Sequence, residues 1–240
     1  MAGHSHWKSI KRKKAVVDSR RGKEWSKIAR LIIIAAKRGG NPDDNLALRY
    51  AIDKGRAANM PNDTIDKAVK KGTGELGGAN YEPTLYEGYA AGGVAILVDA
   101  LTDNRNRSAS EIRVIFDRNG GALGAANTVA WMFSHRGLIA IERTAIGEDQ
   151  LIELALEAGA ADVIASPEGF TIETALADFE RVRRALEQAK IPTVSAELGM
   201  VPSQTITVSG EAAARLQSLI EGLEDNDDVQ NVYSNAQFAD

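Results

Sequence analysis

The 240-residue chain has no cysteine, which excludes disulfide bonds and thiolate metal sites. It also lacks a long apolar run: the longest, residues 31–36, is far shorter than the about 20 residues that a membrane-spanning helix needs. Only three histidines are present, and His135 is the one that lies beyond the first six residues. From these absences we expect a cytoplasmic protein with no membrane partner, no bound metal and no cofactor.

Positive charge is scarce in most of the chain and concentrated at its start. Residues 1–78 contain 18 Lys and Arg against 8 Asp and Glu, a net of +10, whereas residues 79–240 contain 11 against 25, a net of −14. The overall net charge of −4 is therefore the sum of a basic N-terminal part and an acidic remainder. A basic segment on an acidic body is typical of a nucleic-acid-binding module, because phosphates attract the first part and repel the second.

The first 38 residues carry twelve Lys and Arg against two Asp and Glu, and part of them has a helical pattern. Between residues 23 and 38, small and apolar side chains recur every three or four positions, which predicts an amphipathic helix. Lys23, Lys27 and Arg30 fall on its opposite face with residues 37 and 38. Basic residues between positions 8 and 21 extend this row, so a polyanion is the natural partner. The alternative is an ordinary solvated face.

Two shorter helical patterns follow. Residues 41–44 supply a cap, a first-turn proline and acidic side chains, and predict the start of the next helix. Another helix with apolar side chains at positions 65, 68 and 69 ends at Gly72. Residues 72–77 match G-x-G-x-x-G, but they follow a helix instead of a strand, so the match fails as a dinucleotide fingerprint. We interpret residues 72–83 as a linker.

Beyond residue 84 the apolar period changes to that of strands. We expect a strand over residues 94–101, a helix opened by a capping box of Ser108 and Glu111, and a strand over residues 129–133. Residues 137–202 read as strand, helix, strand, strand, helix, strand, which is the βαββαβ order of a ferredoxin-like fold. Residues 205–233 supply only half of such a unit.

These patterns predict an α+β protein. An all-helical N-terminal domain, residues 1–78, precedes two ferredoxin-like α/β domains. One of them is discontinuous and comprises residues 79–136 plus 203–240. The other, residues 137–202, is inserted into it.

The sequence offers few groups that could converge for catalysis. Asp99, Asp103, Glu111 and Asp117 are the carboxylates available for a two-metal nuclease site. The capping box explains Glu111, however, and the exposed side of a helix explains Asp117. His135 ends an apolar strand and is interpreted as structural. We therefore expect no catalytic residue, no enzymatic activity and no small-molecule substrate.

Three local features have both a binding and a structural interpretation. In the segment 103–107, Arg105 and Arg107 are flanked by Asn side chains at the start of a helix. These residues either bind phosphate or an RNA base edge, or only form the turn and the helix cap. Asn59 and Met60 lie at a break between helices, which is either a plain turn or a tip that touches a partner. Trp7 either stacks on a base or packs on its own domain, and we favour packing.

Eight short stretches resemble those of one known family. They are residues 3–7 (GHSHW), 21–23 (RGK), 57–61 (AANMP), 70–75 (KKGTGE), 86–89 (YEGY), 101–107 (LTDNRNR), 119–121 (NGG) and 129–133 (VAWMF). The chain resembles the YebC/PmpR proteins, a group that includes a mitochondrial translational activator of cytochrome oxidase. The resemblance implies a three-domain fold and two roles, DNA-binding transcriptional regulation and relief of ribosomes stalled on proline-rich peptides.

Pattern and resemblance together assign a set of residues to nucleic-acid binding. They are His4, His6, Trp7, Lys8, Lys11, Arg12, Lys13, Lys14, Arg20, Arg21, Lys23, Lys27, Arg30, Asn59, Met60, Arg105 and Arg107. His6 departs from the family, which usually has Lys at this place. Because histidine is mostly neutral at pH 7, a phosphate contact there is weaker.

Two functions compete on this basis. The favoured one is a ribosome-associated translation factor that contacts ribosomal RNA or tRNA; the alternative is a transcriptional regulator bound to duplex DNA. No dimerising heptad is visible, and no helix pair aims Asn, Gln or Arg at bases as a helix-turn-helix reader does. Cations position a protein on nucleic acid without specifying sequence, which favours the first function. A protein-interaction adaptor that uses the acidic domains is left open.

Overall fold

The computed structural model of the chain describes residue 7, residues 21–77 and residues 80–239. These residues fall into two compact units. One comprises residues 21–77, 80–128 and 214–232, and the other comprises residue 7, residues 129–213 and residues 233–239. No helix within the described ranges is long and apolar enough to cross a bilayer.

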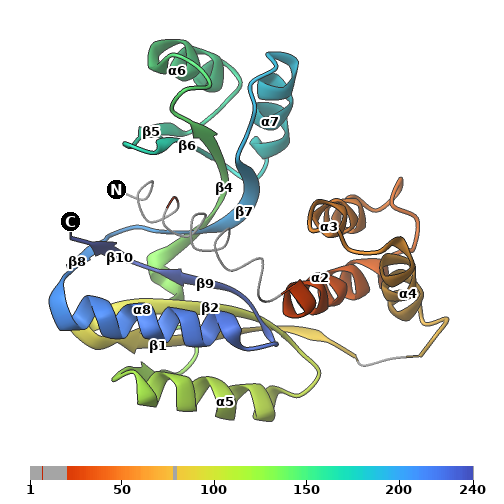
Figure 1. Cartoon of the computed structure of the whole chain (residues 1–240), viewed down its shortest axis with the longest axis vertical. Helices are drawn as coiled ribbons and strands as arrows, with labels where there is room; N and C mark the ends of the chain where they lie inside the picture. The colour runs from red at the N-terminus through yellow and green to blue at the C-terminus, as the bar shows by residue number, and fades with distance from the viewer. Residues whose placement is uncertain (1–6, 8–20, 78–79, 240) are drawn as a thin grey trace. The chain divides into compact units, whose positions relative to one another are not determined.

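The first unit begins with three helices, which we call the helical module (Figure 1). They are α2 (Arg21–Ala36), α3 (Leu46–Ala57) and α4 (Asn62–Thr73). The helix predicted over residues 23–38 is α2. Its apolar face is buried against α3 and α4, and Ile28, Ile32 and Leu48 are at most 2% exposed. Gly72 lets α4 approach α2 closely, because a Cβ at that position would lie 2.5 Å from the Cβ of Ala36.

The start of α3 differs from the prediction. The N-cap is Asn45, whose side chain accepts a hydrogen bond from the backbone N–H of Leu48 at 3.2 Å. The Asn45 amide also donates to the carbonyl of Ala35 at 2.8 Å, which ties the start of α3 to the end of α2. Asn41 instead accepts from the N–H of Asp43 at 3.1 Å in a local turn. The predicted start at residues 41–44 was wrong because this turn competes with the helix.

A four-stranded sheet completes the first unit. Its order is β3-β1-β2-β9. The elements are β1 (Glu82–Ala90), β2 (Val94–Thr102), α5 (Arg105–Arg118), β3 (Ala122–Leu123), α8 (Gly210–Asp225) and β9 (Val229–Ser234). β1 and β2 form an antiparallel hairpin around a short 3₁₀ turn, Ala91–Gly93. β2 is buried along nearly its whole length, as the continuous apolar run predicts. Gly222 of α8 faces Ile115 of α5, so the two helices lie side by side.

Two local predictions in this part of the chain were wrong. α5 begins at Arg105, with Asn104 as its N-cap, so Ser108 opens no capping box. Ser108 is instead fully buried, where its hydroxyl serves a different network. The strand expected over residues 129–133 is a 3₁₀ turn, Ala130–Met132, which leaves Trp131 73% exposed. Over so short an apolar run, periodicity cannot distinguish a buried strand from a helical turn, which explains the wrong prediction.

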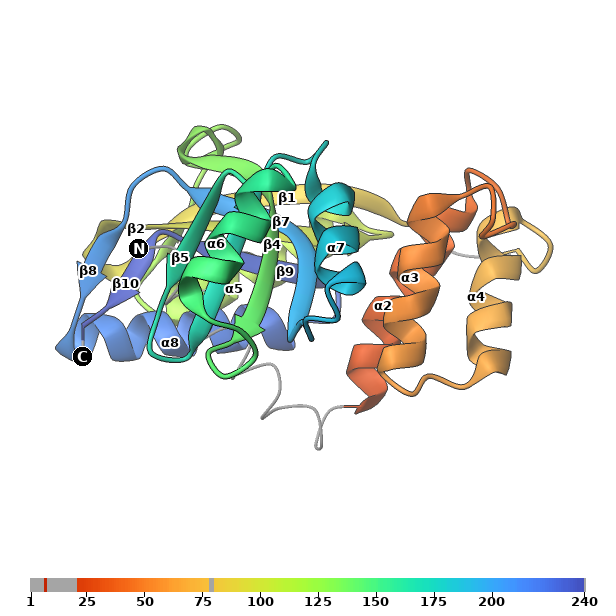
Figure 2. The ribbon, with the colours of Figure 1, turned by 90° about the horizontal axis from the view of Figure 1, so that it is seen from above.

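The second unit contains a complete βαββαβ set (Figure 2). Its elements are β4 (Phe133–Glu142), α6 (Glu148–Glu157), β5 (Asp162–Ala165), β6 (Gly169–Thr174), α7 (Phe179–Gln188) and β7 (Ser195–Pro202). The pairs are antiparallel, in the order β5-β6-β4-β7. Ile139, Ile141, Phe170 and Ile172 alternate along β4 and β6, so they share one face and form a core with α6 and α7.

The last strands divide between the sheets. β9 joins β2, whereas β8 (Ile206–Val208) pairs in parallel with β10 (Ala236–Phe238), a strand that the sequence patterns missed. The chain is thus an α+β protein in which an all-helical N-terminal domain precedes two ferredoxin-like α/β domains. One of these is discontinuous, because α8 and β9 return to the sheet that β1 and β2 begin.

Candidate nucleic-acid interface

Much of the predicted cationic row lies ahead of the helical module. His4, His6, Lys8, Lys11, Arg12, Lys13, Lys14 and Arg20 lie outside the described residues, and Arg21 is the first residue of α2. Their assignment to nucleic acid stays a prediction. The candidates whose side chains are described are Trp7, Lys23, Lys27, Arg30, Asn59, Met60, Arg105 and Arg107.

Two lysines of α2 contact an acidic segment of the same unit. Residues 224–228, Glu-Asp-Asn-Asp-Asp, comprise the last two residues of α8 and the link to β9, and we call them the acidic turn. Lys23 Nζ lies 3.1 Å from the carboxylate of Asp225, and Lys27 Nζ donates to the carbonyl of Glu224 at 2.6 Å. Burial lowers the pKa of Lys27 to about 8, although the nearby charges of Glu224, Asp227 and Asp225 act to raise it.

Arg30, one turn further along α2, is held more firmly. Its Nη1 lies 2.9 Å from Oδ1 of Asp228 and also donates to the carbonyl of Asp227. The guanidinium stacks over the ring of Tyr81, 5.2 Å from its centroid. Only 14% of the Arg30 side chain is exposed. In this arrangement Nη1 faces protein oxygens, and most of the side chain is shielded from solvent.

Asp228 joins Arg30 to the start of α5. Its side chain is 3% exposed, and Oδ2 accepts hydrogen bonds from Arg107 Nη2 at 2.8 Å, Ser108 Oγ at 2.5 Å and Thr102 Oγ1 at 3.2 Å. Burial raises the pKa of this carboxyl group, but the hydrogen bonds from Arg107 and Ser108, together with the charge of Arg30, outweigh burial and hold the pKa below its usual value. Asp228 is therefore a buried carboxylate satisfied by two cations.

Both arginines of the segment 103–107 are paired with carboxylates. Arg105 Nε lies 2.7 Å from Glu82 on β1, and Arg107 Nη2 lies 2.8 Å from Asp103 as well as from Asp228. The hydrogen bonds to Asp228 and Asp103 raise the pKa of Arg107. The side chains are nevertheless 59% and 44% exposed, so part of each guanidinium faces solvent. The structure brings Arg107 together with Arg30, whereas Arg105 lies beside Glu82 at the start of β1.

The remaining candidates differ in exposure. Trp7 is 5% exposed, and a Cβ at Gly169 would lie 2.6 Å from its ring, so the tryptophan packs within the second unit. Met60 is 4% exposed in the core of the helical module. Asn59 has a positive φ of 54° just beyond α3, and its side chain is exposed. Of these three residues, only Asn59 presents its side chain to a partner in this conformation.

Comparison with known proteins decides the family. A family model described as the TACO1/YebC protein N-terminal domain matches residues 5–75, and another described as the TACO1/YebC second and third domain matches residues 81–236. The chain belongs to the TACO1/YebC family. The resemblance that the eight short stretches suggested is confirmed.

Relatives of this TACO1/YebC chain are similar over their full length. A protein from Pelotomaculum thermopropionicum is 51% identical over 243 residues, covering 100% of both chains. One from Clostridium acetobutylicum is 53% identical over 240 residues, covering 99% of this chain and 98% of the other. Both are named probable transcriptional regulatory proteins. A crystal structure of a conserved hypothetical protein, Aq1575 from Aquifex aeolicus, has 41% identity and a TM-score of 0.85 over 94% of each chain, and thus the same fold.

The TACO1/YebC helical module also carries cations that the sequence prediction missed. Lys67, Lys70 and Lys71 of α4 are exposed and form no ion pair with the described part of the chain. They lie away from the face on which Ile65 and Ala68 are buried. A signal for them exists in the sequence, because the same helical spacing that identifies the apolar face of α4 places these lysines on the other side.

The carboxylates considered for a nuclease site have other partners. Asp99 accepts a hydrogen bond from Asn231 at 3.3 Å, and Asp103 pairs with Arg107. Among the described residues of this family member, no group of three or more His, Cys, Asp or Glu could hold a metal ion.

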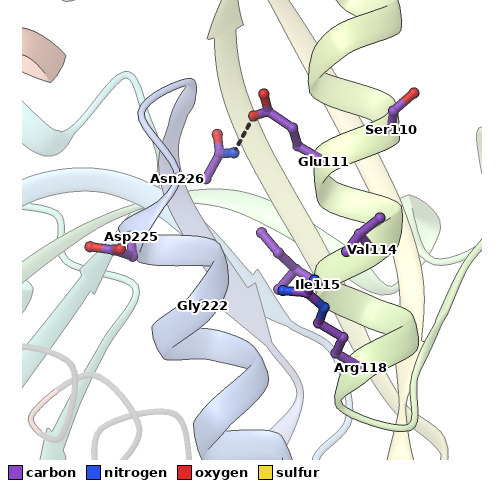
Figure 3. Close-up of a pocket in the computed structure, with 8 residues that line it drawn as sticks. All are labelled: Ser110, Glu111, Val114, Ile115, Arg118, Gly222, Asp225 and Asn226. Atoms are coloured by element: carbon purple, nitrogen blue, oxygen red, sulfur yellow. Dashed lines mark hydrogen bonds between the residues drawn. The ribbon is translucent and has the colours of Figure 1, made fainter.

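A shallow groove of about 550 Å³ lies between α5 and α8 (Figure 3). It is lined by Ser110, Glu111, Val114, Ile115, Arg118, Gly222, Asp225 and Asn226. Figure 3 shows Glu111 and Asn226 facing each other, and the Asn226 amide donates to the Glu111 carboxylate at 2.8 Å. The side-chain oxygen of Asn226 accepts from the N–H of Asp228 at 2.9 Å. Asn226 thus anchors the acidic turn to α5.

Proposed function

We propose that this protein regulates gene expression by binding nucleic acid through its basic N-terminal part, and that RNA of the translating ribosome is its target. The observation that carries the proposal is the charge asymmetry, +10 for residues 1–78 against −14 for residues 79–240. Phosphate contacts dominate the affinity of proteins for nucleic acid, and their cations are Lys and Arg. The exposed lysines of α4 add to the basic surface that the sequence places before α2.

The kind of side chain available favours RNA contacts over base reading in duplex DNA. Reading bases in the major groove needs Arg, Asn or Gln presented from an element that enters it. α3 contains no Asn or Gln, and α4 has Asn62 only at its first residue. Of the two arginines of α3, Arg49 donates to the carbonyls of Pro42 and Asp43, and Arg56 pairs with Asp53. Arg30, Arg105 and Arg107 are paired with carboxylates. The relief of stalling on proline-rich stretches that the resemblance implies fits a factor with broad phosphate contacts.

A DNA-binding transcriptional regulator is the second candidate. The name of the similar proteins from P. thermopropionicum and C. acetobutylicum, probable transcriptional regulatory protein, favours it. The two candidates share the basic surface and differ in sequence preference. Specific duplex readers bind their sites about 10³-fold or more tighter than random DNA, whereas contacts to phosphate alone give no such ratio.

Co-sedimentation with ribosomes at moderate salt tests the proposal. We expect the protein in ribosome fractions, and we expect changing Lys11, Arg12, Lys13 and Lys14 to Ala to release it, because each neutralised phosphate contributes about −0.7 to −0.9 to the log–log salt slope. The matched control replaces Arg113, Arg118, Arg184 and Lys190 by Ala, which removes the same charge from elsewhere in the chain and is expected to leave binding intact. Absence from ribosome fractions, with one promoter preferred by about 10³ or more, would establish the transcriptional role instead.

A further inference from the structure

We propose that the acidic turn, residues 224–228, is an internal competitor of nucleic acid for the cations of α2. This inference rests on the proposed function and adds a regulatory contact to it. In the closed arrangement Lys23, Lys27 and Arg30 contact oxygens of the acidic turn. In the open arrangement the same three side chains contact phosphates.

The spacing of the two partners supports this exchange. Lys23, Lys27 and Arg30 are separated by four and three positions, so they form one row along α2. The acidic turn offers that row a series of oxygens, from the carboxylates of Asp225 and Asp228 and from backbone carbonyls. A phosphate backbone also presents anionic oxygens in a row. The acidic turn therefore satisfies the same donors that a nucleic acid would use.

The composition of α8 shows that the acidic turn depends on cations from outside its own helix. A helix C-terminus carries partial negative charge and is stabilised by Lys, Arg or His in its last turn. The last turn of α8 has no basic residue and contains Glu224 and Asp225 instead. The cations of α2 supply the missing positive charge in the closed arrangement. Nucleic acid that displaces the α2 cations takes their positive charge away from the end of α8, which opposes binding.

The contact is graded along α2, which makes stepwise exchange feasible. At one end, Lys23 and Asp225 are 46% and 39% exposed, and ion pairs so exposed to water are weak. In the middle, the ammonium group of Lys27 is largely removed from water, and this desolvation lowers its pKa to about 8. At the other end, Arg30 and Asp228 are 14% and 3% exposed. An entering phosphate therefore meets the weakest pair first.

The test neutralises the acidic turn and leaves Asp228 and its network in place. The variant Glu224→Gln, Asp225→Asn, Asp227→Asn removes three charges that act on Lys27. The control variant Asp149→Asn, Glu153→Gln, Glu157→Gln removes three charges from α6, where all three residues are exposed. Binding of a labelled mixed-sequence single-stranded RNA to the full chain is measured by fluorescence anisotropy over a salt series, and thermal melting confirms that each variant is folded.

We expect the acidic-turn variant to bind the RNA about 3- to 10-fold tighter than the wild type, and the control variant to change affinity by less than about 2-fold. We also expect amide exchange across residues 226–229 of the wild-type protein to accelerate when RNA is added, because the acidic turn loses its contacts with Lys23, Lys27 and Arg30. Equal affinity gains in both variants, or no gain in the acidic-turn variant, would refute the proposal that the acidic turn competes with nucleic acid. If the wild type and both variants all failed to bind RNA, the proposed function would be refuted as well. RNA binding by the wild type without a gain in the acidic-turn variant would refute the competition alone.

Discussion

Arg30 and Arg107 meet at one carboxylate: Arg30 Nη1 lies 2.9 Å from Oδ1 of Asp228, and Arg107 Nη2 lies 2.8 Å from Oδ2. The two arginines come from α2 and from the start of α5, and Asp228 precedes β9. A carboxylate that is 3% exposed would be strongly destabilising without such partners. The three residues thus link α2, the start of α5 and the segment before β9, which are distant in sequence.

Replacing Asp228 with Asn should destabilise the protein by about 3 kcal/mol at neutral pH, because breaking a buried pair leaves the other charges uncompensated. The pKa of Asp228 is lowered in the folded state, so its contribution is present above the unfolded pKa of about 3.9 and is lost as pH falls through the folded value. Urea denaturation at several pH values checks this. The difference in the free energy of unfolding between wild type and variant should disappear in acid.

The matched control for that experiment is Asp225→Asn. Asp225 pairs with Lys23 at 3.1 Å, but both side chains are well exposed. Such a pair contributes about 0–1 kcal/mol, so the control should unfold close to the wild type at every pH. A gap for Asp228→Asn that stays constant from neutral pH into strong acid would contradict the assignment of the stabilisation to the ionised carboxylate.

A second prediction concerns the titration of Lys27. Its folded pKa of about 8 lies below the unfolded value of about 10.4. Between these values the unfolded chain binds the additional proton, so the free energy of unfolding rises with pH across this window. Carbon-13 NMR of reductively dimethylated lysines should show one resonance that titrates near pH 8 and disappears in Lys27→Arg. If every lysine resonance titrated above pH 10, the buried contact with Glu224 would be refuted.

Much of the fold follows from local sequence patterns, because short-range spacing determines which faces are apolar. Ile28 and Ile32 identify α2, and the apolar run of β2 identifies a buried strand. The start of α3 was misplaced because Asn41 and Asn45 are equally good caps by composition. In the structure Asn41 closes a local turn, whereas the Asn45 amide donates to the carbonyls of Ala35 and Gly39, and composition does not show this difference.

The candidate site was harder to predict, because its partners lie far apart in sequence. Helical spacing put Lys23, Lys27 and Arg30 on one face with residues 37 and 38. The first three lie together in the structure, but α2 ends at Ala36, so residues 37 and 38 are not part of that helical row. No local pattern could show that residues 224–228 contact that face, since the contact spans about 200 residues. Ser108 was misread for the same reason: its spacing to Glu111 fits a capping box, but its hydroxyl donates to Asp228, 120 residues away.

A third prediction tests the close approach of α2 and α4. A Cβ at Gly72 would lie 2.5 Å from both the Cβ of Ala36 and the carbonyl oxygen of Ile33. Gly72→Ala should therefore destabilise the helical module by about 1–3 kcal/mol through overpacking. The matched control, Gly22→Ala, adds a methyl group where nothing lies within 4 Å, and should be neutral or stabilising by up to about 1 kcal/mol. Urea denaturation followed by circular dichroism compares the two variants, and amide exchange in α2 gives a local readout. Similar effects of both changes on the free energy of unfolding would refute the close contact.

The last prediction concerns the boundary of the inserted domain that we proposed over residues 137–202. The first strand of its βαββαβ set, β4, begins earlier, at Phe133. Residues 133–136 pair with residues 199–202 of β7, from Phe133 opposite Pro202 to Arg136 opposite Gly199. A fragment that starts at residue 137 leaves this end of β7 without its partner. We therefore propose residues 133–202 as the folding unit.

Two fragments, residues 133–202 and 137–202, test the boundary by circular dichroism and thermal melting. Both contain the core that Ile139, Ile172 and Val182 share, and both lack Trp7, so the absence of its ring affects them equally. We expect both to fold, with the longer fragment more stable by about 1–3 kcal/mol, because each hydrogen bond of the restored ladder contributes about 0.5–1.5 kcal/mol before end fraying. Equal stability would show that residues 133–136 add nothing. If neither fragment folds, the inserted domain depends on the rest of its unit, and the proposed boundaries are wrong.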